Sequence, residues 1–281
     1  MPLPPPRTWL VTGASRGLGR AFADVALQAG DRVVATARKP AQLDDLVAAH
    51  PDTALALALD VTDRTAVERV VAEATSFTGR LDVLVNNAGY GLAGAVEEAG
   101  EQEVRDQFEV NVFGALWCTQ AVLPVMRAQG AGHLFQISSI GGVAGFLNTG
   151  IYHASKWALE GFSESLAQEV AGFGIGVTIV EPGPFRTDWN GDSMVRANPM
   201  PEYDELLAAR RSAMSGSLAR TQPGDPHKAA QALLTVLDDP QPPRRLLLGK
   251  LAADVAPATY QQRLAEWAAW DHVARDADFD D

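Results

Sequence analysis

Short apolar runs alternate with segments of helical periodicity over most of this 281-residue chain. The apolar runs are typical of buried β-strands and cover residues 9–11, 32–37, 54–60, 81–85, 132–137, 176–180 and 245–248. Segments of helical periodicity follow most of these runs. One ends at Gly30, three begin at Pro40, Asp63 and Asp225, and two cover residues 101–129 and 152–170. This alternation predicts an α/β fold, a doubly wound, mostly parallel seven-stranded sheet with helices on both faces.

Three regions depart from the alternation. The proline-rich residues 1–7 are expected to lie loose, and residues 188–224 show no strand pattern and predict a variable helical or mobile insertion. Residues 251–281 are expected to form a C-terminal helical extension, with an amphipathic helix over Gln261–Val273. Because no Gly-, Ser- or Pro-rich linker divides the alternating region, we expect residues 1–281 to be a single domain.

Composition excludes several classes of protein. Hydrophobic residues make up 47% and charged residues 21%, as in ordinary globular enzymes. The net charge of −12 argues against nucleic acid and anionic membranes as partners. The chain shows neither the apolar segment of a signal peptide nor a run of about 18 apolar residues, so a cytoplasmic protein is expected. Cys118 is expected to be a buried, inert thiol, and the scattered histidines predict no metal site.

The stretch from Ser138 to Lys156 carries the candidate chemistry. Tyr152 and Lys156 are four residues apart, so on a helix they lie on the same face. An ammonium beside a phenol favours the phenolate and lowers its pKa from about 10, which suits proton transfer. Ser139 could donate a hydrogen bond to the oxygen that Tyr152 protonates, although the neighbouring Ser138 competes for this role.

A glycine-rich turn follows the first predicted strand. It reads TGASRGLG over Thr12–Gly19 and stands between that strand and a helix. Glycines in this place permit a tight turn and bring a pyrophosphate close to the N-terminus of the helix. The turn therefore predicts a dinucleotide site.

Taken together, these motifs resemble those of the short-chain dehydrogenase/reductase family. The resemblance rests on TGASRGLG, on NNAG at 86–89, on Tyr152-x-x-x-Lys156, on Ser139 and Asn111, and on Pro182-Gly183 with Thr187. These motifs occur in the family's order over roughly residues 8–187. The resemblance implies a Rossmann-type fold and a nicotinamide cofactor.

The resemblance also implies a role for each matching residue. Tyr152 is the expected general acid or base, and Lys156 lowers its pKa and binds the nicotinamide ribose. Ser139 orients the carbonyl, while Asn111 breaks the long helix and holds a water that connects Lys156 to solvent. The residues expected to bind the cofactor are Gly13, Ser15, Arg16, Gly17, Leu18, Gly19, Arg38, Asp60, Val61, Asn87, Ala88, Gly89, Tyr152, Lys156, Pro182, Gly183 and Thr187. Within NNAG, Asn86 and Ala88 fit a backbone approach to the adenosine ribose, and Asn87 and Gly89 shape the strand end.

The residues at the end of the second predicted strand indicate whether the cofactor is NAD or NADP. An acidic residue there would bind the ribose hydroxyls of NAD, but this chain has Ala37, followed by Arg38. Together with Arg16 from the glycine turn, Arg38 could hold a 2′-phosphate with charge-assisted hydrogen bonds. The expected cofactor is therefore NADP.

The leading hypothesis is an NADP(H)-dependent carbonyl reductase or alcohol dehydrogenase. The alternatives are a catalytically silent NADP-binding sensor or scaffold, and an enzyme that acts on the sugar or base of a nucleotide. The resemblance further implies a homodimer or homotetramer that associates through the helices over 101–129 and 152–170.

Residues 188–224 are expected to form the substrate lid over a small-molecule carbonyl or alcohol with apolar surface. The lid's apolar residues are Trp189, Met194, Met200, Tyr203, Leu206 and Leu207. Its arginines, Arg196, Arg210 and Arg211, either face solvent or meet an acidic group on the substrate.

Overall fold

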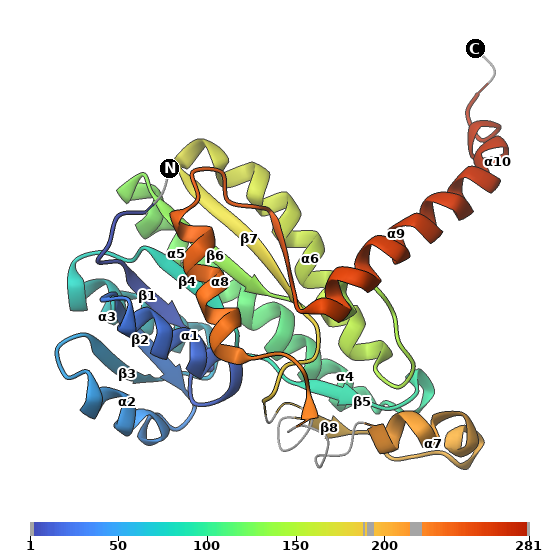
Figure 1. Ribbon diagram of the computed structural model, residues 1–281, viewed down its shortest axis with the longest axis horizontal. Helices are drawn as coiled ribbons and strands as arrows, with labels where there is room; N and C mark the ends of the chain where they lie inside the picture. The colour runs from blue at the N-terminus through green and yellow to red at the C-terminus, as the bar shows by residue number, and fades with distance from the viewer. Residues whose placement is uncertain (1–2, 188, 190–193, 214–220, 280–281) are drawn as a thin grey trace.

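The computed structural model describes residues 3–187, 189, 194–213 and 221–279. Its centre is a parallel seven-stranded sheet in the order β3-β2-β1-β4-β6-β7-β9, which confirms the predicted fold class (Figure 1). The strands are β1 (Thr8–Val11), β2 (Arg32–Ala37), β3 (Ala54–Ala58), β4 (Val83–Asn86), β6 (Gly132–Ile137), β7 (Ile175–Pro182) and β9 (Arg245–Leu248).

Helices pack on both faces of the sheet. One layer contains α1 (Gly17–Gln28), α2 (Asp44–Ala49) and α8 (Pro226–Asp238), and the other contains α3 (Arg64–Thr78), α5 (Ala115–Gln129) and α6 (Gly150–Val170). Side chains alternate along the strands, so Trp9 and Val11 of β1 pack into the first layer and Leu10 into the second. Both faces of the sheet are therefore buried, which explains why its strands are continuous apolar runs.

Local signals set the ends of the helices. Asp63 is the N-cap of α3 as predicted, because its carboxylate accepts a hydrogen bond of 3.0 Å from the backbone N–H of Ala66. Gly79 ends the same helix with φ of 78°, a left-handed conformation that favours glycine.

The long helix predicted over 101–129 is interrupted. Its first part is α4 (Glu101–Phe108), and a π-helical segment, η3 (Glu109–Gly114), connects it to α5. By length and composition, Glu101–Gln129 passes as a membrane span, with a mean hydropathy of 1.2 in an 18-residue window. Of that window 39% is buried, and the buried residues Cys118, Val122 and Met126 lie in the core beside the sheet. Burial raises the pKa of the Cys118 thiol to about 12, as expected for an inert cysteine.

The N-terminal leader is not loose over its described part, contrary to the prediction. Leu3 is 6% exposed, and the Nε of Arg7 donates a hydrogen bond of 2.7 Å to its carbonyl. Asp31 accepts a hydrogen bond of 2.8 Å from the Arg7 backbone N–H, and the Arg7 guanidinium pairs with Asp238. A buried arginine with two carboxylate partners therefore fixes the residues before β1.

The insertion after β7 contains a strand that the sequence did not predict. Strand β8 (Met194–Arg196) pairs in parallel with β5 (Gly91–Ala93) to form a second, two-stranded sheet. A short 3₁₀ turn, η7 (Pro201–Tyr203), and helix α7 (Asp204–Ala213) follow it. Residues 188, 190–193 and 214–220 of the predicted lid lie outside the described part of the chain.

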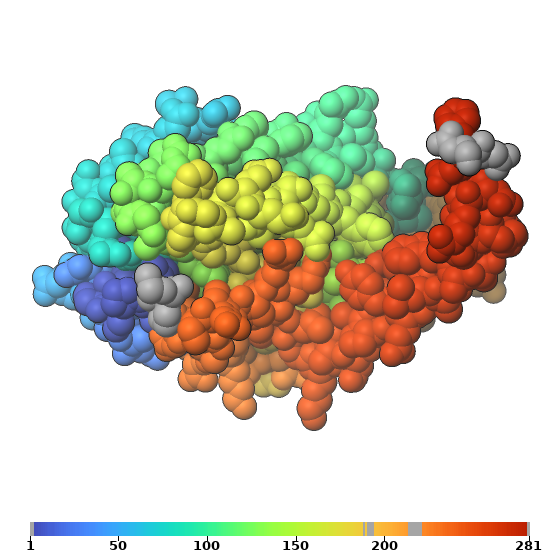
Figure 2. All heavy atoms as spheres, turned by 90° about the horizontal axis from the view of Figure 1, so that it is seen from above, coloured from blue at the N-terminus to red at the C-terminus, as the bar shows by residue number. Residues whose placement is uncertain are grey.

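The C-terminal extension is a longer helix than predicted. Helix α9 runs over Lys250–Ala269, with Pro257 inside it, and α10 covers Asp271–Arg275. Figure 1 shows α9 projecting from the body of the protein, and Figure 2 shows the same projection from above. Its apolar side chains Leu264 and Trp267 are more than half exposed.

A buried cluster of charges ties β9 to β7 and α6. The guanidinium of Arg245 on β9 donates hydrogen bonds to Glu160 of α6 and Glu181 of β7, and one of 2.8 Å to Glu164. Glu160 is 5% and Glu181 2% exposed. Burial raises the pKa of both carboxyls, that of Glu160 to about 7, because water no longer solvates their charges.

We predict that this cluster makes stability pH-dependent. The unfolded chain releases the Glu160 proton near the ordinary pKa of 4.5, whereas the folded protein holds it to about pH 7. The contribution of Glu160 to the free energy of unfolding is therefore fully present below about pH 4.5 and is lost as the pH rises through about 7. The wild type should lose more unfolding free energy between pH 5 and pH 8 than the Glu160→Gln variant, as urea denaturation would measure.

Glu164→Gln is the matched control, because Glu164 lies one turn further along α6 and is 49% exposed. The control should keep the pH slope of the wild type. Equal slopes for wild type and Glu160→Gln would contradict the prediction.

Candidate active site

A cleft lies at the carboxyl ends of the central strands, where the loops after β1, β2, β3, β4, β6 and β7 converge. It encloses about 1620 Å³, more than the roughly 300–1000 Å³ of a typical ligand pocket. All the site residues predicted from the sequence line this cleft except Gly19 and Asn111, which lie behind its wall. The cleft therefore has room for a dinucleotide and a further small molecule.

The glycine turn forms one end of the cleft. Gly13 and Gly17 have φ of 65° and 60°, a backbone conformation that other residues rarely adopt. A Cβ on Gly19 would lie 2.3 Å from the side-chain nitrogen of Asn87, which donates hydrogen bonds of 2.9 and 3.0 Å to the carbonyls of Thr12 and Gly13. Gly19 thus lets the turn pack against the end of β4, and Asn87 fixes its shape.

The N-terminus of α1 opens onto this turn without a side-chain cap. Arg16 is the N-cap residue, its side chain caps no backbone N–H group, and the first turn of the helix carries no acidic residue. Backbone N–H groups at such an end attract an anion, and Ser15, Gly17 and Leu18 also line the cleft here. This donor set fits a pyrophosphate.

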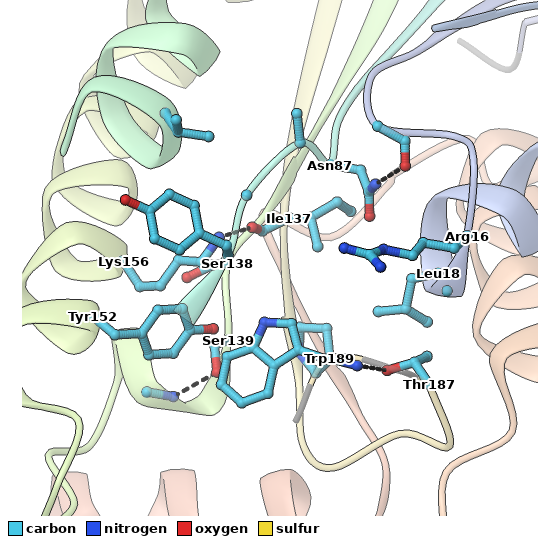
Figure 3. Close-up of a pocket in the computed structure, with 18 of the residues that line it drawn as sticks. Arg16, Leu18, Asn87, Ile137, Ser138, Ser139, Tyr152, Lys156, Thr187 and Trp189 are labelled. Carbon is cyan, nitrogen blue, oxygen red and sulfur yellow. Dashed lines mark hydrogen bonds between the residues drawn. The ribbon is translucent and has the colours of Figure 1, made fainter. Parts of the chain in front are cut away.

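Cationic side chains surround the cleft where β2 ends. Arg16, Arg38 and Lys39 line it beside Ala37, and both arginines are exposed (Figure 3 shows Arg16). Within the described part of the chain, no ion pair engages Arg16 or Arg38. Lys39 is not among the residues predicted from the sequence, although its position directly after Arg38 could have indicated it.

The loops after β3 and β7 complete this part of the cleft. Asp60 and Val61 line it, and the Asp60 carboxylate accepts hydrogen bonds of 3.1 and 2.8 Å from the backbone and hydroxyl of Thr62. On the opposite side, Thr187 faces the glycine turn, because a Cβ on Gly17 would lie 3.5 Å from the Thr187 Cβ. Pro182, Gly183, Ala88 and Gly89 also line the cleft.

Tyr152, Ser139 and Lys156 converge at the other end of the cleft. Figure 3 shows the Tyr152 hydroxyl pointing toward Ser139, whose Oγ accepts a hydrogen bond of 3.0 Å from the backbone N–H of Gly141. Lys156 is 6% exposed and donates a hydrogen bond of 2.8 Å to the carbonyl of Ile137. The hydroxyl groups of Tyr152 and Ser139 can therefore bind one oxygen atom.

The structure distinguishes the two candidate serines. A Cβ on Gly142 would lie 2.5 Å from the Ser138 Oγ and 2.8 Å from the Glu160 Oε1, so these two atoms lie behind the loop. Ser138 thus faces the buried Glu160 carboxyl, whereas Ser139 faces Tyr152. Ser139, which the spacing from Tyr152 favours, is thus the serine that lies beside Tyr152.

The expected lowering of the Tyr152 pKa is not found in the protein alone. Burial raises the pKa of Tyr152 to about 12, and the hydrogen bond from Ser139 opposes this only in part. Burial also lowers the pKa of Lys156 to about 8, while the charge of Glu160 raises it. The Lys156 ammonium is 5.9 Å from the centre of the Tyr152 ring and bonds to Ile137 instead. At neutral pH the phenol therefore keeps its proton.

Asn111 supports this end of the cleft from behind. It lies in the π-helical segment η3, so the predicted local break of the helix is confirmed. Its side chain accepts a hydrogen bond of 3.1 Å from the backbone N–H of Tyr90 and donates bonds of 3.0 and 3.1 Å to the Tyr90 carbonyl and the Ser155 Oγ. Asn111 and Lys156 lie on the same side of Gly89, whose Cβ would be 3.0 Å from the Asn111 Oδ1 and 3.7 Å from the Lys156 Nζ.

His153, which was not predicted from the sequence, fixes the loop that follows Ser139. Its Nδ1 accepts a hydrogen bond of 3.2 Å from the Phe146 backbone N–H, and its Nε2 lies 3.0 Å from the Thr149 Oγ1. Burial lowers the pKa of His153 to about 4, and the charge of Arg210 adds to this effect. The neutral ring thus holds both ends of the segment between Phe146 and Thr149.

Apolar side chains line the cleft beyond Tyr152. The Trp189 ring lies 5.2 Å from the Tyr152 ring (Figure 3). Phe146 and Val195 also line the cleft. The other predicted lid residues lie elsewhere. Met194 packs against Trp189, Leu207 is buried, and Leu206 is 59% exposed. The Tyr203 hydroxyl donates a hydrogen bond to Glu97, and the backbone N–H of Met200 donates one to Glu98.

Comparisons with known proteins agree with this geometry. Residues 7–196 match the model of the short chain dehydrogenase family. The oxidoreductase BOA17 of Botryotinia fuckeliana is 44% identical, over 89% of this chain and 91% of its own. A 3-ketodihydrosphingosine reductase of Bacteroides thetaiotaomicron is 37% identical, over 88% of this chain and 89% of its own.

Among solved structures, a short-chain dehydrogenase from Streptomyces avermitilis superposes with a TM-score of 0.90. It shares 47% sequence identity, and the match covers 97% of this chain and 100% of that one. The chain therefore belongs to the short-chain dehydrogenase family of oxidoreductases.

Proposed function

We propose that this protein is an NADP(H)-dependent oxidoreductase that interconverts a carbonyl compound and a secondary alcohol. The observation that carries the proposal is the arrangement of Tyr152 and Ser139, whose hydroxyl groups lie close together in a cleft with room for a dinucleotide. Two such donors stabilise the negative charge that develops on a carbonyl oxygen during reduction. The 3-keto group in the name of the Bacteroides relative supports a ketone substrate.

The protonation state of Tyr152 favours reduction at neutral pH. Since burial raises its pKa to about 12, the phenol holds the proton that a reduced carbonyl oxygen requires. When bound, the nicotinamide cofactor supplies or accepts the hydride. Ser139 donates a hydrogen bond to the carbonyl oxygen and holds it beside Tyr152.

Lys156 and Asn111 act behind Tyr152. The Lys156 ammonium is buried next to the Tyr152 ring, and its hydrogen bond to the Ile137 carbonyl fixes its direction. Its pKa of about 8 lets it exchange protons near neutral pH, which suits the replacement of a proton that Tyr152 has given up. Asn111 is a positioning residue, because its three hydrogen bonds hold Tyr90 and Ser155 around this lysine.

The charges at the end of β2 support NADP over NAD. Arg16, Arg38 and Lys39 surround the place where an adenosine ribose of a dinucleotide would lie, and Ala37 offers no carboxylate for the ribose hydroxyls. Guanidinium groups bind a phosphate with charge-assisted hydrogen bonds. The apolar wall of Phe146, Trp189 and Val195 further supports a substrate with apolar surface.

Tyr152→Phe should lower kcat for ketone reduction by about 10²–10⁴-fold, because the ring remains but its proton donor is lost. The Kd for NADPH, measured by fluorescence titration, should stay within about threefold of the wild type. Lys156→Ala should weaken both turnover and NADPH binding.

Tyr260→Phe is the matched control for Tyr152→Phe, because Tyr260 lies on the exposed part of α9. It should retain wild-type turnover. A Tyr152→Phe variant that kept more than a few per cent of the rate would assign the proton transfer to another group.

Arg38→Asp should reduce the preference for NADPH over NADH by roughly tenfold or more, since a hydrogen bond to a charged group contributes about 1.5–3 kcal/mol. The measurement is kcat/KM for each cofactor with one ketone. Arg69→Asp on α3 makes the same change of charge at an exposed site and should leave the preference unchanged. Equal efficiency of the wild type with both cofactors would refute the assignment of NADP.

A further inference from the structure

The two neighbouring arginines of α7 have different surroundings. Arg211 forms ion pairs of 2.5 Å with Glu98 and 2.7 Å with Asp204. Arg210 forms no ion pair within the described part of the chain, and its Nε is buried without a hydrogen-bond partner there. Arg211 therefore anchors α7 to the residues after β5, whereas Arg210 remains available for another partner.

Arg210 lines the same cleft as Tyr152. Its guanidinium carbon lies 6.0 Å from the centre of the Phe146 ring, and that ring lies 5.5 Å edge-on from His153. His153 in turn lies 5.8 Å from the Tyr152 ring. A series of ring contacts thus connects the catalytic tyrosine to Arg210 along one wall.

The surroundings of the Arg210 guanidinium favour binding of an anion. A guanidinium next to an aromatic ring loses part of its hydration, and although the ring face attracts the cation, only an acceptor satisfies its N–H donors. Among the described residues of the cleft wall, its neighbours Phe146 and His153 offer no carboxylate, because one is apolar and the other is a neutral imidazole. The planar fork of an arginine matches the two oxygens of a carboxylate.

We propose that Arg210 binds an anionic group of the substrate, so that the substrate class is an amphipathic ketone with a carboxylate, sulfonate or phosphate. Its apolar body would lie along Phe146 and Trp189, with the carbonyl at Tyr152 and the anion at Arg210. The reaction at Tyr152 rests on the proposed function, but the anion site itself does not.

Binding tests the site without turnover. Calorimetry in the presence of NADP⁺ would compare decanoate, decyl sulfonate and decyl phosphate with methyl decanoate, which has the same apolar chain but no charge. We expect the wild type to bind at least one of the three anions about 10- to 100-fold more tightly than the ester. The anion that binds most tightly identifies the group.

Substitution assigns the effect to Arg210. Arg210→Met keeps the apolar stem of the side chain and should remove the preference for the anion, while Arg210→Lys should retain part of it. Arg105→Met removes one positive charge from an exposed position on α4 and should keep the wild-type preference. Equal binding of anion and ester by the wild type, or an unchanged preference in Arg210→Met, would overturn the proposal.

Turnover separates this proposal from the proposed function. A series of oxodecanoic acids with the ketone at successive positions would be assayed with NADPH beside their methyl esters. A higher kcat/KM for the acids than for the esters, lost in Arg210→Met, is the expected result. Reduction of both at equal rates would refute the anion site alone, whereas preferential anion binding without any reduction would refute the proposed function alone.

Discussion

Parallel pairing of the seven strands is the constraint on which the rest of the structure depends. Because the strands run in one direction, the loops that follow them emerge at one edge of the sheet and meet there. The glycine turn after β1, Arg38 after β2 and Ser139 after β6 are far apart in sequence, yet all line one cleft. Burial of both faces by helices fixes the sheet, and thereby the relative positions of these loops.

Burial of charged and ionisable groups gives this cleft its chemical character. Helix α6 carries Tyr152 and Lys156 on its cleft side and the buried Glu160 one turn further on. Desolvation keeps the proton on Tyr152 and lowers the pKa of Lys156 toward neutrality. In the same cleft, the Nε of Arg210 is buried without a hydrogen-bond partner among the described residues. The protonation states of Tyr152 and Lys156 thus depend on the exclusion of water as much as on individual contacts.

The sequence predicted those parts of the molecule that depend on local periodicity and short motifs. The strand over 132–137 has the predicted bounds, and the cofactor motifs line the cleft because each follows a predicted strand. Strand β8 was missed because its three residues carry no periodicity and pair only with β5. The role of His153 and the direction of the Tyr152 pKa shift also depend on tertiary burial, which no local pattern encodes.

We propose that the cleft holds a nicotinamide cofactor and a carbonyl compound so that a hydride passes between them. The most direct measurement incubates the wild-type protein with NADPH and a panel of apolar and anionic ketones, and quantifies both NADPH and alcohol. With at least one ketone, one alcohol should form for each NADPH consumed. Tight binding of NADPH without ketone-dependent consumption across the panel would contradict it and would indicate a catalytically silent cofactor-binding protein.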